Sequence, residues 1–339
     1  MTKADQTTSG TAQATDAAHR PPSVAVLTKL PQDLRSALEA RYHLVEHDPA
    51  GDSRPGLRLA VTTSMAGANE QAMASLPDLG FIGCQGVGLD KIDLPAASRR
   101  GITVAHTPDV LTEDVADFAV ALMYGIARKV VEADGFVRAG RWSRERMVPS
   151  TRLHGKRAGV VGLGRIGSAI ARRAAGIGMT VSYYNPSERP GVPYERSPDL
   201  VSLAREADVL FLANPGGPST NRMVDAAVLD ALGPEGFLVN ISRGSVVDEA
   251  ALLRALSEKR IAGAGLDVFA SEPGLDERFL GAGDDVGVQS QSGQCVASVQ
   301  SGNGIVFHDK DAKAGAEEIH RSATFAIPQC GSEGPTCPH

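Results

Sequence analysis

A glycine-rich turn in segment 156–190 restricts the fold of this sequence more than any other feature. The segment reads KRAGVVGLGRIGSAIARRAAGIGMTVSYYNPSERP, which is an apolar strand, a G-x-G-x-x-G turn, an amphipathic helix and a second strand. Gly162 permits the tight turn, Gly164 lets backbone approach a pyrophosphate, and Gly167 allows close packing of helix on strand. The helix N-terminus also attracts phosphate charge. The pattern therefore predicts a dinucleotide site rather than an ordinary glycine-rich turn.

The end of the second strand bears on which dinucleotide binds. A carboxylate there would read the ribose 2′-hydroxyl of NAD, but this sequence has Asn185. A neutral side chain does not repel a 2′-phosphate, and Ser187 and Arg189 are suited to donate hydrogen bonds to one. NADP(H) is therefore favoured, with NAD(H) as the alternative because Glu188 is a ribose acceptor. The loop could also be a surface turn that contacts nothing.

Composition excludes several other classes of function. The 339 residues are 42% hydrophobic and 22% charged, with a net charge of -6, so a broad basic surface for nucleic acid or anionic membrane is not expected. No stretch approaches the roughly 20 apolar residues of a membrane span. Four cysteines form neither a disulfide framework nor a metal-ligand spacing. We expect a cytoplasmic protein with a small-molecule ligand and no metal.

Strands and helices alternate along most of the chain. Short apolar runs and helical patterns alternate from Val24 to about residue 106, and again from Ala158 to Phe269, which predicts parallel sheets covered by helices. Between these series, residues 113–138 have the periodicity of one long helix. A basic loop with the single tryptophan, Trp142, follows. Residues 1–20 are polar without periodicity and are expected to be a disordered tail.

Two further segments place polar side chains just after apolar strands. Arg243 follows one strand, where an arginine fork can bind a carboxylate and polarise an adjacent carbonyl. Asp267 ends the next strand, and Glu272 comes shortly after it. A carboxylate beside a histidine would raise the imidazole pKa and orient the ring for proton donation. From position alone, a surface ion pair is an equally good interpretation of Arg243. The alternative for either acid is a solvated loop residue.

Several motifs in the expected order resemble one known family. They are GCQGVGLDKIDLPAASRRGITVAHTPDVLTEDVADFAVAL, HGKRAGVVGLGRIGSAIARR, VNISRGSVVDEAALLRALSEKRIAGAGLDVF and SEP, within residues 56–280. They resemble the D-isomer-specific 2-hydroxyacid dehydrogenases, and most closely the glyoxylate/hydroxypyruvate reductase branch. The resemblance implies hydride transfer from a nicotinamide to the carbonyl carbon of a small 2-oxo acid, giving the 2-hydroxy acid.

The resemblance also implies an α/β fold of two doubly wound parallel-sheet domains. A Rossmann dinucleotide-binding domain, residues 111–284, would be inserted into a flavodoxin-like substrate domain that begins with residues 21–110. Residues 285–339 should return to the substrate domain, but their sequence is atypical. The helix from residue 113 and the loop with Trp142 resemble the family's dimerisation arm, which implies a homodimer.

Site residues follow from the same motifs. Arg243 matches the substrate-binding and catalytic arginine, Glu272 matches the acid that partners the catalytic histidine, and the backbone of Val87 and Gly88 matches the loop that binds the substrate carboxylate. The residues expected to bind the cofactor are Gly162, Gly164, Arg165, Ile166, Gly167, Asn185, Ser187, Arg189, Asn214, Pro215, Ile241 and Asp267.

The histidine of the family is absent from its expected position. That position corresponds to Ser290, between Gln289 and Gln291, and no histidine lies between His154 and His308. Serine and glutamine are poor proton donors near neutral pH. Substitute acids would be His106, or His308 and His320 if the chain folds back. The family pattern stops at about Gly281. A further hypothesis is therefore that the reading frame changes near the codon for this residue.

Two functions therefore stay open on the sequence. The first is an NAD(P)H-dependent reductase of a 2-oxo acid, with proton donation weakened or replaced. The second is a non-catalytic dinucleotide-binding regulator or scaffold, since the C-terminal-binding corepressors resemble this fold more distantly and act through partners.

Overall fold

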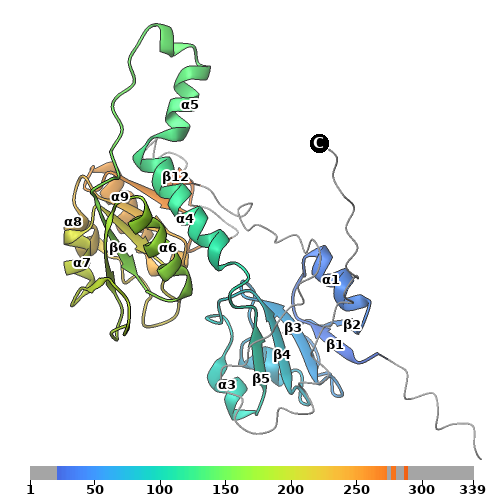
Figure 1. Ribbon diagram of the computed structural model, residues 1–339. Helices are drawn as coiled ribbons and strands as arrows, with labels where there is room; N and C mark the ends of the chain where they lie inside the picture. The colour runs from blue at the N-terminus through green and yellow to red at the C-terminus, as the bar shows by residue number, and fades with distance from the viewer. Residues whose placement is uncertain (1–20, 273–275, 280–285, 289–339) are drawn as a thin grey trace, which may run out of the picture. The chain divides into compact units, whose positions relative to one another are not determined.

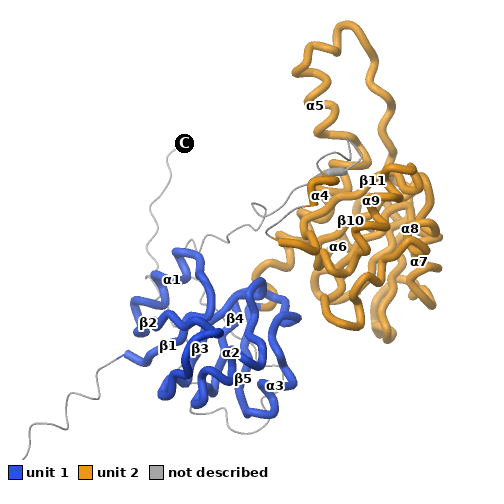
Figure 2. The backbone as a smooth tube through the Cα atoms, turned by 180° about the vertical axis from the view of Figure 1, so that it is seen from behind, with its two compact units in different colours: residues 1–107, 304–326 blue, residues 108–303, 327–339 orange. Residues whose placement is uncertain are grey.

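The described residues form two compact units. The computed structural model describes residues 21–272, 276–279 and 286–288. Among them, unit 1 is residues 21–107 and unit 2 begins at Pro108 (Figure 2). The predicted tail 1–20, and residues 289–339 of the atypical C-terminal segment, lie outside the described residues, and so does the expected return of the chain to unit 1.

Unit 1 is a five-stranded parallel sheet with the strand order β2-β1-β3-β4-β5 (Figure 1). Alternate residues of β1 serve opposite faces, since Val24 and Val26 pack with α1 whereas Ala25 packs in the cluster that includes α2 and α3. This order is that of a flavodoxin-like sheet, as predicted. The elements are β1 (Ser23–Val26), α1 (Gln32–Glu39), β2 (His43–Glu46), β3 (Leu59–Thr63), α2 (Glu70–Ala74), β4 (Phe81–Gln85), α3 (Leu94–Arg99) and β5 (Thr103–His106).

Unit 2 is a seven-stranded parallel sheet with the order β12-β11-β10-β9-β6-β7-β8. The strand order reverses beside β6, which is where doubly wound sheets bind ligands. Its elements are α4 (Thr112–Ala127), α5 (Val130–Arg138), η1 (Arg141–Ser143), β6 (Arg157–Val161), α6 (Arg165–Gly176), β7 (Thr180–Tyr184), β8 (Glu195–Arg196), α7 (Leu200–Glu206), β9 (Val209–Leu212), α8 (Ala226–Leu232), β10 (Phe237–Asn240), η2 (Gly244–Val246), α9 (Glu249–Ser257), β11 (Gly263–Leu266), η3 (Glu277–Phe279) and β12 (Val286–Val288).

Helices cover both faces of the sheet in unit 2. In β9, Val209 and Phe211 pack with α4 and α6, whereas Leu210 and Leu212 pack with α7, α8 and α9. All four residues of that strand are buried, as expected for a parallel strand between two helical layers. The apolar runs of the sequence are therefore the central strands of a Rossmann sheet.

The single helix predicted over residues 113–138 is interrupted. Lys129 has φ 52° and ψ 44°, in the left-handed region, and it separates α4 from α5. The buried face of α4 ends at Ala127, while Phe136 is the one buried residue of α5. The break occurs where the packing of α4 against the sheet ends. The helical periodicity of the sequence continues beyond that point, which is why the sequence predicted one helix. Figure 1 shows α5 leading away from the sheet of its own unit.

Candidate active site

The glycine-rich turn lies between β6 and α6, and two of its glycines are sterically required. A Cβ on Gly162, whose φ is +90°, would lie 2.6 Å from the backbone nitrogen of Asn214. A Cβ on Gly167 would lie 2.0 Å from the carbonyl oxygen of Gly162. By contrast, a Cβ on Gly164 would meet nothing within 4 Å, and this residue is the N-cap of the 12-residue helix α6. The turn thus presents open backbone at a helix N-terminus, as phosphate binding requires.

Asn185 stands at the end of β7, where the sequence places the ribose-reading residue. Its side-chain oxygen accepts a hydrogen bond from the backbone nitrogen of Leu163 at 2.8 Å, so it ties β7 to the glycine-rich turn. Its carbonyl oxygen accepts from the guanidinium of Arg196 at 2.9 Å. Sequence reasoning missed both contacts because they join residues far apart in the chain. The side chains of Ser187 and Arg189 are exposed beyond this anchor.

Asn214 and Pro215 follow β9, directly against the glycine-rich turn. Asn214 is 8% exposed, and its amide nitrogen donates to the carbonyl oxygen of Pro215 at 3.1 Å. Its Oδ1 is buried and has no hydrogen-bond partner in the described part of the chain. Because an unsatisfied buried acceptor costs about 1–3 kcal/mol, a donor from a ligand would be favourable there. This orphaned oxygen and the open Gly164 backbone fit a dinucleotide.

The other predicted cofactor residues of unit 2 occupy the same edge of the sheet or the start of α6. Arg165 forms an ion pair with Asp109 at 2.7 Å. Ile166 is half-buried in the first turn of α6. Ile241, which is buried, directly follows β10.

The turn that carries Arg243 is held by Asn240, the last residue of β10. The Asn240 side chain is 1% exposed and its oxygen accepts from the backbone nitrogen of Ser242 at 3.0 Å and from the Ser242 hydroxyl at 2.9 Å. Its nitrogen donates to the carbonyl oxygen of Arg243 at 3.1 Å. Arg243 itself donates to the Ser242 carbonyl at 2.7 Å. Sequence reasoning missed Asn240, although a polar residue ending an apolar strand was the available signal.

Close packing joins this turn to the loop after β11. A Cβ on Gly244 would lie 1.9 Å from the carbonyl carbon of Phe269, so only glycine fits. Glu249 accepts a hydrogen bond from the backbone nitrogen of Ala270 at 2.7 Å, and Glu272 accepts from that of Phe269 at 2.8 Å. Since β10 and β11 are neighbouring parallel strands, the turn with Arg243 and the loop with Glu272 share one edge of the sheet.

Asp267 is a half-buried acid in that loop. Burial, followed by the negative charge of Glu272, raises the pKa of Asp267 to about 6. The folded protein therefore holds this proton more tightly than the unfolded chain does. The stabilisation is present in acid and is lost as the pH rises through about 6.

Replacing Asp267 with asparagine is expected to raise the free energy of unfolding near neutral pH by about 1–3 kcal/mol. The gain should vanish below about pH 4, where the carboxyl group is protonated in both states. Urea unfolding between these pH values measures the difference. Glu235→Gln, at an exposed position of the same unit, is the control and should show no such trend. A difference that does not change with pH would contradict the assigned cause.

Val87 and Gly88 lie in unit 1, in the turn that follows β4. His106, at the end of the neighbouring strand β5, is 4% exposed, and its Nδ1 lies 3.0 Å from the carbonyl oxygen of Val87. The structure thus brings together a predicted substrate loop and a histidine considered as a substitute acid. The other histidines considered as substitute acids, His308 and His320, lie outside the described residues, and so does Ser290 at the expected histidine position.

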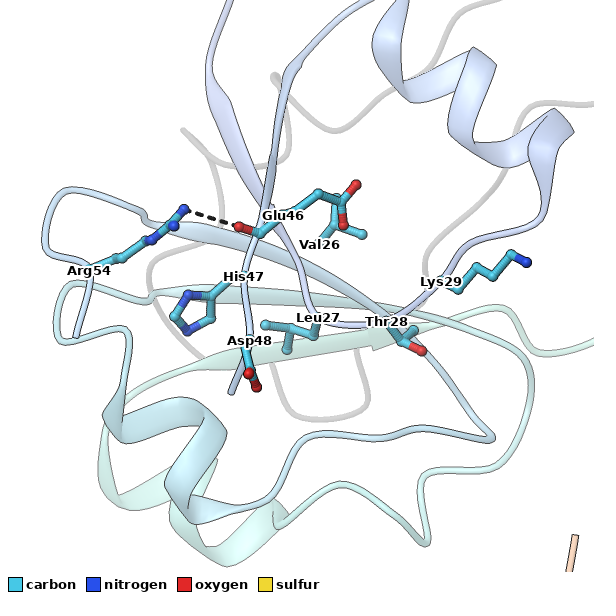
Figure 3. A pocket seen from close by; sticks show the side chains of 8 residues that line it. All are labelled: Val26, Leu27, Thr28, Lys29, Glu46, His47, Asp48 and Arg54. Atoms are coloured by element: carbon cyan, nitrogen blue, oxygen red, sulfur yellow. Dashed lines mark hydrogen bonds between the residues drawn. The ribbon is translucent and has the colours of Figure 1, made fainter. Parts of the chain in front are cut away.

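A separate pocket opens in unit 1 at the carboxyl ends of β1 and β2 (Figure 3). His47 lines it, and its Nε2 lies 2.7 Å from the Ser75 hydroxyl. Burial lowers the pKa of this histidine. The side chain of Lys29 points away from His47 in Figure 3. None of the sequence-predicted site residues lines this pocket, and we assign it no role.

Two predicted absences concern metals and membranes. Within residues 21–272 and the short described segments beyond them, no cluster of His, Cys, Asp or Glu has the arrangement of a metal site. In those residues no helix is both long and apolar enough to cross a bilayer.

The fold and the site define a dinucleotide-binding α/β protein. Its parallel sheet carries the glycine-rich turn at the switch point, and Arg243 follows β10 at the same edge, with β9 between. Residues 120–288 match the family model described as "D-isomer specific 2-hydroxyacid dehydrogenase, NAD binding domain". The chain is 44% identical to 2-ketogluconate reductase of Gluconobacter oxydans over 283 residues, 83% of this chain and 90% of that protein. It therefore belongs to the D-isomer-specific 2-hydroxyacid dehydrogenase family, whose members are NAD(P)-dependent oxidoreductases.

Other relatives agree with this assignment. Glyoxylate/hydroxypyruvate reductase A of Arabidopsis thaliana is 41% identical over 268 residues, 76% of this chain and 86% of that protein. Among solved structures, a 2-hydroxyacid dehydrogenase from Ketogulonicigenium vulgare Y25 has a TM-score of 0.72 at 39% identity, covering 79% of this chain and 86% of that one. An NADPH-dependent glyoxylate/hydroxypyruvate reductase from Sinorhizobium meliloti, in complex with NADP and malonate, has a TM-score of 0.71 at 39% identity, covering 78% and 84%. These relatives do not favour the non-catalytic alternative.

Proposed function

We propose that this chain reduces a small 2-oxo acid of the glyoxylate or hydroxypyruvate type to the 2-hydroxy acid, with NADPH favoured as the hydride source. The observation that carries the proposal is the shared sheet edge, where the turn with Arg243 and the loop with Asp267 and Glu272 pack against each other. That edge continues across β9 to the glycine-rich turn.

Each residue has a distinct part in the proposed reaction. The nicotinamide supplies the hydride when it is bound. The Arg243 guanidinium binds the substrate carboxylate and withdraws electron density from the carbonyl, which makes the carbonyl carbon a better hydride acceptor. In the family, backbone N–H groups at the positions of Val87 and Gly88 bind the substrate carboxylate, and we propose this role for them here. Asn240 fixes the turn that carries Arg243, so the guanidinium is positioned before the substrate arrives.

Proton delivery is the step of the proposed reaction for which the described residues supply the fewest suitable groups. We assign Glu272 the role of holding a proton donor, and its oxygen accepts a hydrogen bond from the backbone nitrogen of Phe269. In the family that donor is a histidine, whereas Ser290 occupies the position here. General acid catalysis typically contributes about 10²–10⁴ in rate. We therefore expect turnover to be weak relative to dinucleotide binding unless another group delivers the proton.

The test of function combines binding with turnover. NADPH and NADH are titrated by fluorescence, and their oxidation is then followed with glyoxylate and with hydroxypyruvate. The proposal expects binding of a dinucleotide and oxidation that depends on the 2-oxo acid. Binding without oxidation would favour a regulatory role, and failure to bind either dinucleotide would refute both functions.

The preference for NADPH is proposed from the loop after β7. Arg189 and Ser187 are exposed beside the Asn185 anchor, and both are hydrogen-bond donors for a 2′-phosphate. Arg189→Ala should weaken NADPH binding about 10- to 150-fold and change NADH binding little, because a charge-assisted bond to phosphate contributes about 1.5–3 kcal/mol. Arg205→Ala, an exposed arginine on α7, is the matched control. Equal losses for both dinucleotides would overturn the assignment.

We also propose a homodimer formed through the arm made of α5, η1 and the following loop. Val131 is 80% exposed and Trp142 is 72% exposed on this arm, and apolar side chains of this size are normally covered in an assembly. The double variant Val131→Glu/Trp142→Glu should sediment as a monomer where the unchanged chain sediments as a dimer. Val110→Glu, at an exposed valine before α4, should not change the mass. A cytoplasmic location and the absence of a nucleic-acid partner stay predictions from composition.

A further inference from the structure

The turn after β4 is tied to the end of β5 through two consecutive carbonyl groups. The Gly86 carbonyl oxygen accepts a hydrogen bond from the backbone nitrogen of Thr107 at 3.1 Å. The Val87 carbonyl oxygen lies 3.0 Å from Nδ1 of His106. A carbonyl oxygen only accepts hydrogen bonds, so Nδ1 must carry the proton in this contact. β4 and β5 are neighbouring strands of unit 1 (Figure 1), which brings the two turns together.

Anchoring these carbonyls determines where the next two N–H groups point. In a planar trans peptide the C=O and N–H bonds are antiparallel. With the Gly86 and Val87 carbonyls directed toward the end of β5, the N–H groups of Val87 and Gly88 are directed away from it. Among the described residues, neither N–H group donates to a backbone or side-chain acceptor. Two adjacent donors are therefore available for an anion at the carboxyl end of β4.

The turn has little freedom to reorient these donors. Gly86 has φ +119°, and a Cβ there would lie 2.3 Å from the hydroxyl oxygen of Ser64. Its own N–H group donates to the side-chain oxygen of Thr107 at 2.9 Å. Gly86 is thus held between the ends of β3 and β5. Among the described residues, the side chain that fixes the Val87 carbonyl is His106.

We propose that His106 is a positioning residue, which fixes the Val87 carbonyl through Nδ1–H and thereby aims the Gly88 N–H group at the carboxylate of the substrate. This inference rests on the proposed function, because it takes the anion to be the carboxylate of the 2-oxo acid. Under this proposal His106 orients the loop and is not the substitute acid considered from the sequence. A ring that is 4% exposed and whose Nδ1 proton is committed to a carbonyl oxygen is held for orientation.

The proposal distinguishes two substitutions of similar size. In His106→Asn, the Nδ2 of asparagine stands at about the same number of bonds from the backbone as Nδ1 of histidine, and it donates a hydrogen bond. In His106→Leu the donor is lost and the peptide is free to rotate. A positioning role therefore predicts rescue by asparagine, whereas a proton-donating role predicts failure of both variants, since an amide does not titrate.

The first experiment detects which nitrogen of the His106 ring carries the proton, and it does not require the chain to be catalytically active. Long-range ¹H–¹⁵N spectra of the imidazole groups, assigned with His106→Asn, report which ring nitrogen carries the proton. A protonated Nδ1 at neutral pH is expected. A ring protonated only at Nε2 would overturn the proposal whether or not the chain is an active reductase.

The second experiment measures kinetics with glyoxylate in the full chain. His106→Leu should raise the KM about 10-fold or more with a smaller change in kcat, because a backbone hydrogen bond to a charged group is weakened. His106→Asn should keep the KM within about threefold of the unchanged chain. Glycolaldehyde lacks the carboxylate, so its KM should be the same in the leucine variant as in the unchanged chain. The Kd for NADPH, whose predicted residues lie in unit 2, should be the same in all three proteins.

The remaining outcomes would each contradict either the positioning role of His106 or the proposed function. Equal KM values for the leucine variant and the unchanged chain, or equal losses in both variants, would overturn the positioning role while leaving the reductase function intact. A melting temperature lowered in the leucine variant alone, with KM unchanged, would assign His106 to stability only. If the unchanged chain binds NADPH but neither reduces glyoxylate nor binds oxalate by calorimetry, the proposed function fails, and the positioning role fails with it.

Discussion

Replacing Arg243 with lysine is expected to lower kcat/KM for a 2-oxo acid by about 100-fold or more. Arginine offers a planar fork that binds a carboxylate through two parallel bonds, and lysine offers a single point charge. Loss of one preorganised donor that acts on developing charge typically costs about 10²–10³ in rate. Arg243 also uses one N–H group on the Ser242 carbonyl at 2.7 Å, a contact that holds the fork in place.

Steady-state kinetics with glyoxylate, together with the Kd for NADPH, checks this expectation. The binding of dinucleotide should be nearly unchanged, because the loss concerns the 2-oxo acid. Arg254→Lys, an exposed arginine on α9 that follows the same turn, is the matched control and should retain kcat/KM. If Arg243→Lys and Arg254→Lys behave alike, Arg243 is a surface residue and the proposed site is wrong.

Replacing Gly167 with alanine is expected to abolish measurable dinucleotide binding and to destabilise unit 2 by about 3 kcal/mol. The added Cβ would lie 2.0 Å from the Gly162 carbonyl oxygen and 3.0 Å from its carbonyl carbon, and an alanine side chain has no torsion that could relieve this clash with backbone. The α6 N-terminus would have to move away from β6. Fluorescence titration with NADPH and the thermal midpoint of unfolding measure the two effects.

The same turn and helix supply two informative controls. Gly164→Ala places its Cβ in open space, so it should leave the melting temperature unchanged while weakening NADPH binding, because the space it fills is that of the pyrophosphate. Gly176→Ala, at the other end of α6, also meets nothing within 4 Å. It should bind NADPH normally and be slightly more stable, by up to about 1 kcal/mol, from helix propensity. Normal NADPH binding by Gly167→Ala would show that the turn is not the dinucleotide site.

Much of the fold was predictable because its determinants are local in the sequence. The glycine spacing around Gly162 and the alternation of apolar runs with helical patterns were sufficient for parallel sheets with a switch point at β6. Arg243 and Asp267 could be predicted to lie at one edge of the sheet, because parallel strands end there. Each of these inferences needs only a window of neighbouring residues.

The parts that escaped prediction depend on contacts between distant segments. The break at Lys129 reflects where the sheet stops supporting α4, and the anchoring of Asn185 by Leu163 and Arg196 joins separate turns. Similarly, the sequence analysis named His106 as a substitute acid but did not reveal that its ring reaches the Val87 carbonyl. Local propensity does not contain such information.

The packing of α4 has a consequence for synthesis of the chain on the ribosome. Leu122 of α4 contacts β11, since a Cβ on Gly265 would lie 3.0 Å from the Cβ of Leu122. The partner strand is made on the order of 10 s after the helix, at about 5–20 residues per second. During that interval the part of the apolar face of α4 that packs on β11 lacks its partner, although α6 and β9 already cover other parts of the helix. Nascent chains that end just before β11 should therefore bind chaperones more strongly than chains that include this strand.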